Sequence, residues 1–395
     1  MQLIFVNHCH PDTPHVCATR QREFADACAA AGHRVVLLSE TLPGTSLDMS
    51  PTALPAELDG HDWRVPFRLA CAPVAGKLAG DLREGRIVAP LRKPLIAAYY
   101  LARGGLFTDW RDGSEPYWPA LARAFRPEAI WASFGNTDAW VIGQGIARLS
   151  GCGWVMDVKD PWSVFIPGPL RKILAARFAD CVGATALSAG HAEDAERWFA
   201  RKPAVIYSGI GDSFLASLRP ATQGERVLLI VGGLYSAAHL SAMIDGIGRW
   251  SRGGETVAYV GNENARFLDA ARPLAPRVRL QALGFVGLDR MRDLASAAAA
   301  LLYVRNPSAL YQHKLIELLS LDRPVLSLPG ESAESHAIAD HLGARLISCD
   351  DAAGLAAGLK QAFAQGPVAA SRAQLARYTW TAQSQRLLAV LKGEK

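Results

Sequence analysis

The chain has 395 residues, half of them apolar, and a net charge of +5. This length exceeds what one hydrophobic core usually serves and predicts two domains. No stretch of about 18 apolar residues without charges occurs, so the sequence does not predict a membrane-spanning helix.

The first forty residues have the pattern of a strand, a helix and a second strand. An apolar stretch at 3–7 is followed by a helical pattern that stops at Gly32, and the apolar stretch 34–40 comes next. A connection of this length is typical of a parallel sheet. The N-terminus lacks the basic region and the cleavage site of a signal peptide, so we expect a cytoplasmic protein.

The loop after the first strand, residues 7–20, is rich in histidine and cysteine. Its spacings match no zinc pattern, and none of the seven cysteines forms a CxxC pair, so we expect reduced thiols and no bound metal. An imidazole from His10 or His15 is a candidate for binding a sugar or transferring a proton. An ordinary polar loop is the alternative.

Residues 41–60 are rich in Pro, Ser, Thr and Gly and predict a loop. Helical patterns follow at 69–84 and 94–103.

These helices lie in a basic segment. Between Arg64 and Arg103 there are eight basic and two acidic residues, a surplus larger than that of the whole chain. No nucleic-acid-binding module is visible, so we expect no nucleic-acid partner. A membrane surface or an anionic ligand is the expected partner around Arg92 and Lys93, and an ordinary solvated face is the alternative.

Alternating strands and helices resume near residue 129, and a second α/β series follows the polar linker 219–225. We expect domains at 1–215 and 216–375, followed by a terminal helical segment at 376–395. Both domains are of the α/β class and Rossmann-like, so ligands should bind beyond the carboxyl ends of the strands, in the cleft between the domains. The first strand is not followed by G-x-G-x-x-G, which argues against a nicotinamide-dependent oxidoreductase.

The stretch 312–330, QHKLIELLSLDRPVLSLPG, has a pattern suited to a nucleotide. A helix predicted to begin near His313 would offer free N–H groups and its positive dipole end to a phosphate. Lys314 adds a positive charge, and Glu317, one turn later, suits the two hydroxyls of a ribose. An amphipathic helix with a solvated Glu317 is the alternative.

A second stretch, GWVMDVKDPWSVFIPG at 153–168, leads from a predicted buried strand into a loop. Lys159 and Asp160 are candidates for ligand contact there. The alternative is a structural Asp–Pro turn with Trp162 packed beneath it.

Both stretches resemble glycosyltransferase family 4. The first resembles the family's K-x-x-E…P-V motif, and the second resembles the D-x-R-D-P-W motif of a divergent branch, with Lys159 in place of arginine. Ala309 replaces the first glutamate of the family's E-x7-E pair. The matching residues of the first motif are Lys314, Glu317, Arg323, Pro324 and Val325.

The resemblance extends to weaker motifs along the chain. Arg20 fits the family's opening loop, although its double glycine is missing, and Arg20 or a histidine of this loop is expected to compensate by meeting a phosphate charge. Gly232 and Gly233 fit the loop that receives the diphosphate, with Tyr235 near the position of the family's basic residues. Val286 is expected beside the nucleotide base.

The resemblance implies the GT-B fold, two Rossmann-like domains facing each other across a cleft, with a C-terminal helix that crosses back to the first domain. It implies a glycosyltransferase that retains anomeric configuration without a metal and needs no cofactor besides its nucleotide-sugar co-substrate. The implied donor-binding residues include His313, Lys314 and Glu317. The expected acceptor is a glycan or a lipid-linked precursor of a surface polysaccharide, met at the inner face of the cytoplasmic membrane.

Two alternatives stay open. The missing motif residues suit a degenerate, non-catalytic GT-B scaffold subunit of a glycosylation complex. A sugar-nucleotide epimerase of the same fold is the other alternative, although no set of acid–base residues for it can be placed on the sequence.

Overall fold

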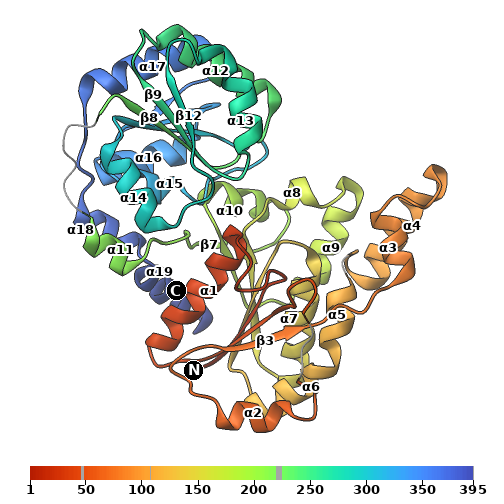
Figure 1. Ribbon diagram of the computed structural model, residues 1–395. Helices are drawn as coiled ribbons and strands as arrows, with labels where there is room; N and C mark the ends of the chain where they lie inside the picture. The colour runs from red at the N-terminus through yellow and green to blue at the C-terminus, as the bar shows by residue number, and fades with distance from the viewer. Residues whose placement is uncertain (46–48, 107, 219–224, 395) are drawn as a thin grey trace. The chain divides into compact units, whose positions relative to one another are not determined.

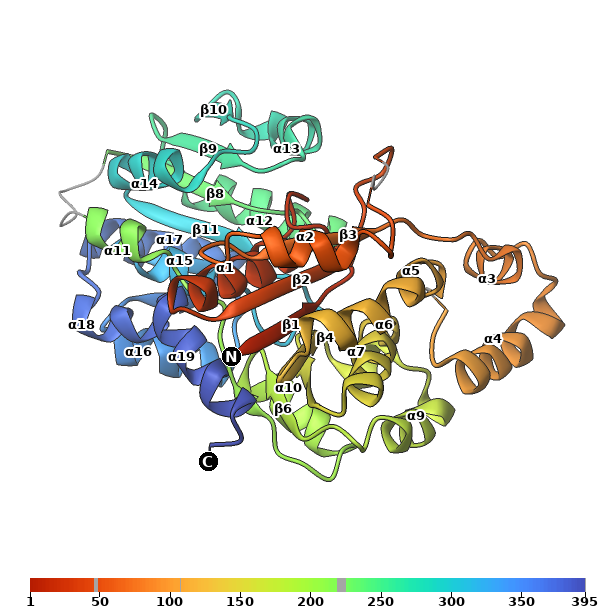
Figure 2. The ribbon, with the colours of Figure 1, turned by 90° about the horizontal axis from the view of Figure 1, so that it is seen from below.

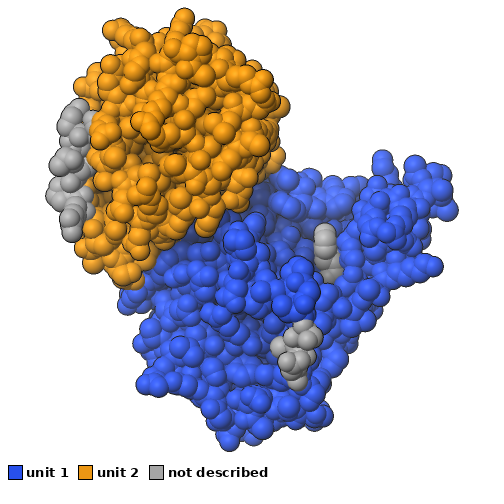
Figure 3. Space-filling view, viewed as in Figure 1, with its two compact units in different colours: residues 1–208, 380–395 blue, residues 209–379 orange. Residues whose placement is uncertain are grey.

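The computed structural model describes residues 1–45, 49–106, 108–218 and 225–394. The chain forms two compact units, one from Met1–Ser208 and Trp380–Lys395 and the other from Gly209–Thr379 (Figure 3). The boundaries expected from the sequence fall after residues 215 and 375. Most of the expected linker, residues 219–224, lies outside the described residues.

Unit 1 is built on a seven-stranded sheet in the order β3-β2-β1-β4-β5-β6-β7, and every pairing between neighbours is parallel. Its strands are short apolar runs that the flanking helices bury (Figure 1). They are β1 (Gln2–Val6), β2 (Arg34–Glu40), β3 (Phe67–Cys71), β4 (Ala129–Ser133), β5 (Gly153–Val158), β6 (Gly183–Ala186) and β7 (Ala204–Val205).

The helices of unit 1 connect these strands, and α19 returns from the far end of the chain. They are α1 (Val16–Ala30), α2 (Leu54–Gly60), α3 (Lys77–Arg83), α4 (Ala89–Arg103), α5 (Thr108–Ser114), α6 (Trp118–Ala120), α7 (Thr137–Ser150), α8 (Trp162–Phe165), α9 (Arg171–Arg177), α10 (Ala189–Glu196) and α19 (Trp380–Leu391). Helix α19 packs against α1 and buries Leu387 and Leu388 in the core beside Phe24 and Trp131. The C-terminal helix therefore belongs to the N-terminal unit, as expected.

Unit 2 is built on a six-stranded parallel sheet in the order β10-β9-β8-β11-β12-β13. The strands are β8 (Val227–Val231), β9 (Thr256–Val260), β10 (Arg279–Ala282), β11 (Ala300–Val304), β12 (Val325–Leu328) and β13 (Leu346–Ser348). The helices are α11 (Asp212–Ser217), α12 (Ala237–Trp250), α13 (Asn264–Ala271), α14 (Leu288–Ala297), α15 (Leu315–Leu319), α16 (Ala333–Leu342), α17 (Ala352–Gln365) and α18 (Arg372–Leu375). Helices α12 and α17 pack against each other over the sheet.

The region 41–103 corrects the sequence-based prediction. Helix α2 lies within the stretch expected to be a loop, and the helix expected at 69–84 begins only at Lys77. Residues Phe67–Cys71 form β3, which pairs with β2 at the edge of the sheet. Its residues are buried except for Arg68, and the pairing with β2, with Pro73 shortly beyond, favours a strand over a helix.

Helices α3 and α4 lie away from the strands of unit 1 in both ribbon views (Figures 1 and 2). Helix α4 buries none of its fifteen residues. Among the described residues, no helix has both the length and the apolar composition that crossing a bilayer requires.

Candidate functional site

Each sheet has one point where the direction of strand addition reverses. In unit 2 the chain adds β9 and β10 on one side of β8 and then crosses to place β11 on the other side. In unit 1 the same reversal lies between β1 and β4. Ligands of open α/β sheets bind beyond the carboxyl ends of the strands at such switch points.

Lys314 lies at the switch point of unit 2. Its Nζ donates to the carbonyl oxygen of Val231, at the end of β8, over 2.9 Å, and lies 5.0 Å from the centroid of the Tyr303 ring. Gly232 has a φ of 95°, and a Cβ atom built on it would lie 2.2 Å from this Nζ. Only glycine therefore allows both the left-handed backbone and the close approach of the ammonium group.

Opposing effects act on the pKa of Lys314. Burial lowers its pKa to about 8, although the nearby charges of Glu317 and Glu331 act in the opposite direction. The group is still mostly protonated at neutral pH, and an incoming phosphate would stabilise its charge further.

Glu331 lies beside Tyr303 and contacts three side chains near the site. Its carboxylate accepts hydrogen bonds from the Tyr303 hydroxyl at 2.6 Å and the Ser335 hydroxyl at 2.9 Å, and it lies 3.6 Å from the Arg305 guanidinium. Burial, followed by the charge of Glu331, raises the pKa of Tyr303 well above its usual value. Sequence reasoning missed Tyr303, Arg305 and Glu331, although each lies at or just after the carboxyl end of a strand, where polar residues deserve notice.

The other residues expected to bind a donor lie on loops and short helices of unit 2. Tyr235 is 52% exposed, and its ring lies against Gly233. His313 and Glu317 are half-buried before and within α15. Val286 is half-buried between β10 and α14, next to Phe285, which is 72% exposed.

The helix predicted to begin near His313 begins two residues later and is short. Helix α15 begins at Leu315 and has five residues, of which four are buried. A helix of this length has only a weak dipole, so the positive charge at this end comes mainly from Lys314. Arg323, which matched the family motif, is 1% exposed and donates to the carbonyl oxygen of Ser296, so its role is structural.

At the switch point of unit 1, Lys159 follows β5 and is 2% exposed. Its Nζ lies 2.6 Å from the Cys17 sulfur and 3.6 Å from a carboxylate oxygen of Asp160. Burial alone would lower the pKa of Lys159, but the charges of Cys17 and Asp160 raise it above its usual value. Burial raises the pKa of Asp160, whose side chain is 31% exposed.

The two histidines expected at this site have different surroundings. His15 is the N-cap of α1, and its Nδ1 accepts a hydrogen bond from the Cys17 backbone N–H at 3.2 Å. His10 accepts instead from the Asp12 backbone N–H, and burial lowers its pKa. His8, which belongs to the same histidine- and cysteine-rich loop, packs against Gly135 after β4, and burial followed by the Lys159 charge lowers its pKa to about 4.

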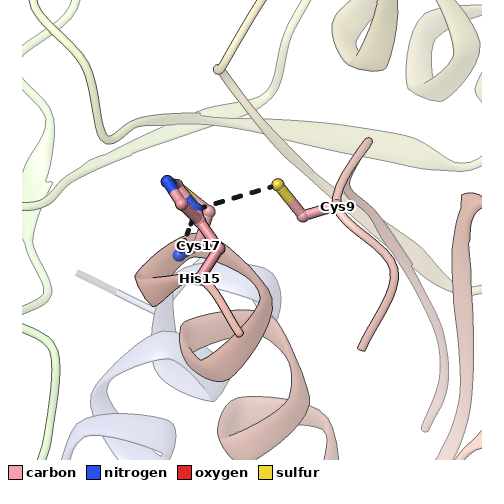
Figure 4. A group of neighbouring side chains, drawn as sticks. All are labelled: Cys9, His15 and Cys17. Atoms are coloured by element: carbon pink, nitrogen blue, oxygen red, sulfur yellow. Dashed lines mark hydrogen bonds between the residues drawn. The ribbon is translucent and has the colours of Figure 1, made fainter. Parts of the chain in front are cut away.

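Cys9, His15 and Cys17 come together although their spacing matched no metal motif. Their Sγ and ring-nitrogen atoms all lie within 4.8 Å of one another, with His15 and Cys17 at the start of α1 and Cys9 on the loop after β1 (Figure 4).

Arg20 is placed differently from the expectation. Its side chain is 1% exposed, forms an ion pair with the buried Asp157 at 3.2 Å, and lies over the rings of Phe24 and Trp131. Because Asp157 is fully buried, this pair neutralises two charges inside unit 1. Arg20 is therefore a structural residue and not a phosphate ligand.

Arg92 and Lys93 lie on α4. The Arg92 guanidinium donates to the carbonyl oxygen of Leu82 at 3.2 Å, whereas Lys93 is exposed. Apolar side chains accompany them on this part of the chain: Val88 is 64% exposed and Leu91 is 57% exposed.

Solved structures share this architecture over the full length of the chain. The Anabaena protein Alr3699/HepE, solved in complex with UDP, aligns over 100% of both chains with a TM-score of 0.63 and 13% sequence identity. A glycosyltransferase from Rickettsia africae aligns over 99% of this chain and 97% of its own, with a TM-score of 0.59 and 11% identity. AviGT4, a glycosyltransferase of avilamycin A biosynthesis, aligns over 99% and 98%, with a TM-score of 0.52 and 14% identity.

The chain has the GT-B fold. Comparison of the sequence with protein-family models and with curated proteins gave no match. At these low identities the similarity establishes the GT-B architecture, while the activity has to be argued from the residues at the two switch points.

Proposed function

We propose that this protein is a glycosyltransferase that transfers a sugar from a nucleotide-diphosphate sugar to an acceptor. The observation that carries the proposal is the Lys314 ammonium group, held over Gly232 at the switch point of the unit 2 sheet. A positive charge beside an open glycine turn is suited to a diphosphate. The complexes of Alr3699/HepE with UDP and UDP-glucose make uridine diphosphate the first nucleotide to test.

In this proposal unit 2 holds the donor. Glu317 accepts hydrogen bonds from the ribose hydroxyls, the main chain near Val286 contacts the base, and Gly233 and Tyr235 border the diphosphate. Lys314 stabilises the negative charge that develops on the leaving diphosphate as the glycosidic bond breaks. Because a lysine supplies this charge, the proposed reaction needs no metal and no cofactor besides the nucleotide sugar, and we propose that it retains anomeric configuration.

Unit 1 contacts the acceptor in this proposal. Asp160 is partly exposed and its pKa is raised, so it is suited to accepting a proton from an acceptor hydroxyl. Lys159 positions Asp160 through their ion pair, and the charge of His15 acts on the same carboxyl group. His10, on the loop after β1, remains a candidate for contact with the sugar. The acceptor we propose is a lipid-linked or surface-polysaccharide precursor, reached from the cytoplasmic side of the membrane through α4.

Nucleotide binding to the purified full-length chain tests the donor site. We expect UDP or another nucleoside diphosphate to raise the melting temperature, and Glu317→Ala to weaken its binding about tenfold, because a charged acceptor of hydrogen bonds is lost. With an active donor and acceptor, Lys314→Met should lower kcat about 100-fold.

Lys360→Met is the matched control, because Lys360 is an exposed lysine on α17, and it should behave as the wild type. If none of UDP, GDP, dTDP, ADP or their sugars binds, the transferase assignment fails and the scaffold alternative is favoured.

A further inference from the structure

Two cysteines that the proposed transfer reaction does not use form a cluster with Lys159. Cys17 lies in the first turn of α1, and Cys9 lies on the loop that leads from β1 to this helix. The Cys9 side chain points toward the start of α1 in Figure 4. The Cys9 and Cys17 sulfurs lie within 4.8 Å of each other, and the Lys159 ammonium lies 2.6 Å from the Cys17 sulfur. The Cys9 sulfur also lies 3.2 Å from Nε2 of His8.

The Lys159 ammonium beside the sulfur favours the thiolate form of Cys17. The neighbouring Cys9 thiol, together with the charge of Lys159, lowers the pKa of Cys17 well below its usual value despite burial. The proximity of Cys17, together with burial, raises the pKa of Cys9, so the thiol proton of the pair is favoured on Cys9. One nucleophilic sulfur therefore lies beside one protonated sulfur, the arrangement found in thiols that react with peroxides and are then resolved.

Two contacts of this cluster argue against a bound metal ion. Lys159 already places a buried positive charge on the Cys17 sulfur, and a second cation there would be repelled. The lone pair on Nδ1 of His15 is directed at the Cys17 backbone N–H, which caps α1. Binding a metal through that nitrogen would remove the cap.

We propose that Cys17 and Cys9 form a peroxide-reactive pair in which Cys17 is the attacking thiolate and Cys9 the resolving thiol, so that oxidation closes a Cys9–Cys17 disulfide. Cys17 is 7% exposed and Cys9 is half-buried, so we expect an oxidant as small as hydrogen peroxide. The three side chains lie at the switch point of unit 1, next to Asp160 and His15.

The chemistry balances in two steps. The Cys17 thiolate attacks one oxygen of hydrogen peroxide, the O–O bond breaks, and after uptake of one proton the products are Cys17 sulfenic acid and water. The Cys9 sulfur then attacks the sulfenic sulfur, the S–O bond breaks, and the hydroxide leaves with the Cys9 proton as a second water. The two sulfurs are oxidised by two electrons in total, and the peroxide is reduced by two.

Closure changes the charges at this loop. The disulfide has no negative charge, so Lys159 loses its thiolate partner and keeps only Asp160. Because Lys159 is buried, the loss of one of its two counter-charges alters the electrostatics around Asp160. Oxidation of the two cysteines would therefore change the electrostatics at the switch point of unit 1.

Peptide mass mapping of the full-length protein tests the proposal. The protein is treated with hydrogen peroxide, free thiols are alkylated at intervals, and each cysteine is followed separately. We expect Cys17 to be consumed about tenfold faster than Cys152, a half-buried thiol whose pKa burial raises. The product should be a Cys9–Cys17 cross-linked peptide that has lost two hydrogens and that dithiothreitol reverses.

Two variants make the roles separable. Cys9→Ser should leave Cys17 reactive but stop the reaction at a sulfenic acid that dimedone traps. Lys159→Met should slow the consumption of Cys17 about tenfold, and Lys159→Arg should restore most of the rate.

Three results would overturn the proposal. Oxidation of Cys17 no faster than of Cys152 would refute its role, and a cross-link from Cys17 to Lys159 in place of Cys9 would refute the disulfide. Stoichiometric zinc that shields Cys9 and Cys17 from alkylation in the freshly purified protein would assign the cluster to a metal.

Discussion

At the scale of single residues, the donor site proposed for unit 2 depends on one lysine, Lys314, which is held in a buried environment. The Lys314 ammonium group needs Gly232 for its approach, the Val231 carbonyl as its acceptor and the Tyr303 ring below it. Glu331 holds that ring in place through the Tyr303 hydroxyl. A change at any of these positions should therefore act on nucleotide binding through the position or the charge of Lys314.

The lowered pKa of Lys314 predicts a pH dependence of nucleotide binding. With the pKa at about 8, UDP affinity should be constant near neutral pH and fall about tenfold per pH unit above that pKa, because the protonated form binds the diphosphate. Calorimetric titration across this range measures it. Lys314→Arg should keep its affinity at high pH, and a wild-type affinity that does not change above pH 8 would contradict the prediction.

The same lysine affects stability in a predictable direction. Its folded-state pKa lies below the ordinary value of 10.5, so the unfolded chain binds more protons between these two values. The contribution of Lys314 to stability should therefore rise with pH in that window and be unfavourable below it.

At the scale of elements, helix α4 contributes no buried residue to the hydrophobic core. It contains Pro90 and Pro94 and buries no residue, yet it carries exposed Leu91 and Leu101. Exposed apolar side chains beside basic residues such as Arg92 and Lys93 are typical of a segment that lies on an anionic membrane.

Vesicle co-sedimentation tests α4. We expect the protein to bind vesicles containing phosphatidylserine and not vesicles of phosphatidylcholine alone. Replacing Arg92 and Lys93 by serine should weaken the binding by about tenfold or more, since each basic residue near such a surface contributes on the order of 1 kcal/mol. A double variant of exposed basic residues elsewhere, Arg226 and Lys360, is the control. Equal binding to both kinds of vesicle, or no binding, would refute this role.

At the scale of the whole molecule, unit 1 is assembled from both ends of the chain, with unit 2 inserted between them. The chain passes between the units after Ser208 and after Thr379, and residues near these two points contact each other. Ile210 forms a parallel bridge with Thr379, and the Tyr207 backbone N–H donates a hydrogen bond to the side chain of Gln383 over 2.9 Å. Trp380 packs on Phe24 with ring centroids 5.3 Å apart. The core of unit 1 is therefore complete only when α19 has docked.

Shortening a buried side chain of α19 should lower the stability of the two units unequally. Leu387 is fully buried in the core of unit 1, so Leu387→Ala should lower the stability of this unit by about 2–5 kcal/mol. Hydrogen exchange should show lost protection in β1, β4 and α1 and near-normal protection in β8 and β11. Leu149→Ala, at a residue that is 56% exposed, is the control. Equal loss of protection in both units would show that they unfold as one.

Much of this architecture follows from local patterns in the sequence. Apolar runs such as LIFV and VVLL bury themselves as parallel strands, and glycines stop several of the helices between them, so the α/β class and the two-part organisation are predictable from one chain. Lys159, Asp160 and Lys314 were singled out because they follow strands or begin a helix. Edge strand β3 was missed because a five-residue strand in a basic segment has little periodicity to detect.

Only the tertiary structure decided which of the charged residues are available to a ligand. Arg20 and Lys314 both carry a positive charge in a promising motif, but folding buries Arg20 against Asp157 and brings Lys314 to the end of β8. Folding likewise brings Cys9 and Cys17 close to Lys159, which is more than 140 residues away from Cys17 in the sequence. Sequence patterns report the local conformation and the burial of a segment, whereas the partner of a buried charge is set by contacts between segments distant in the chain.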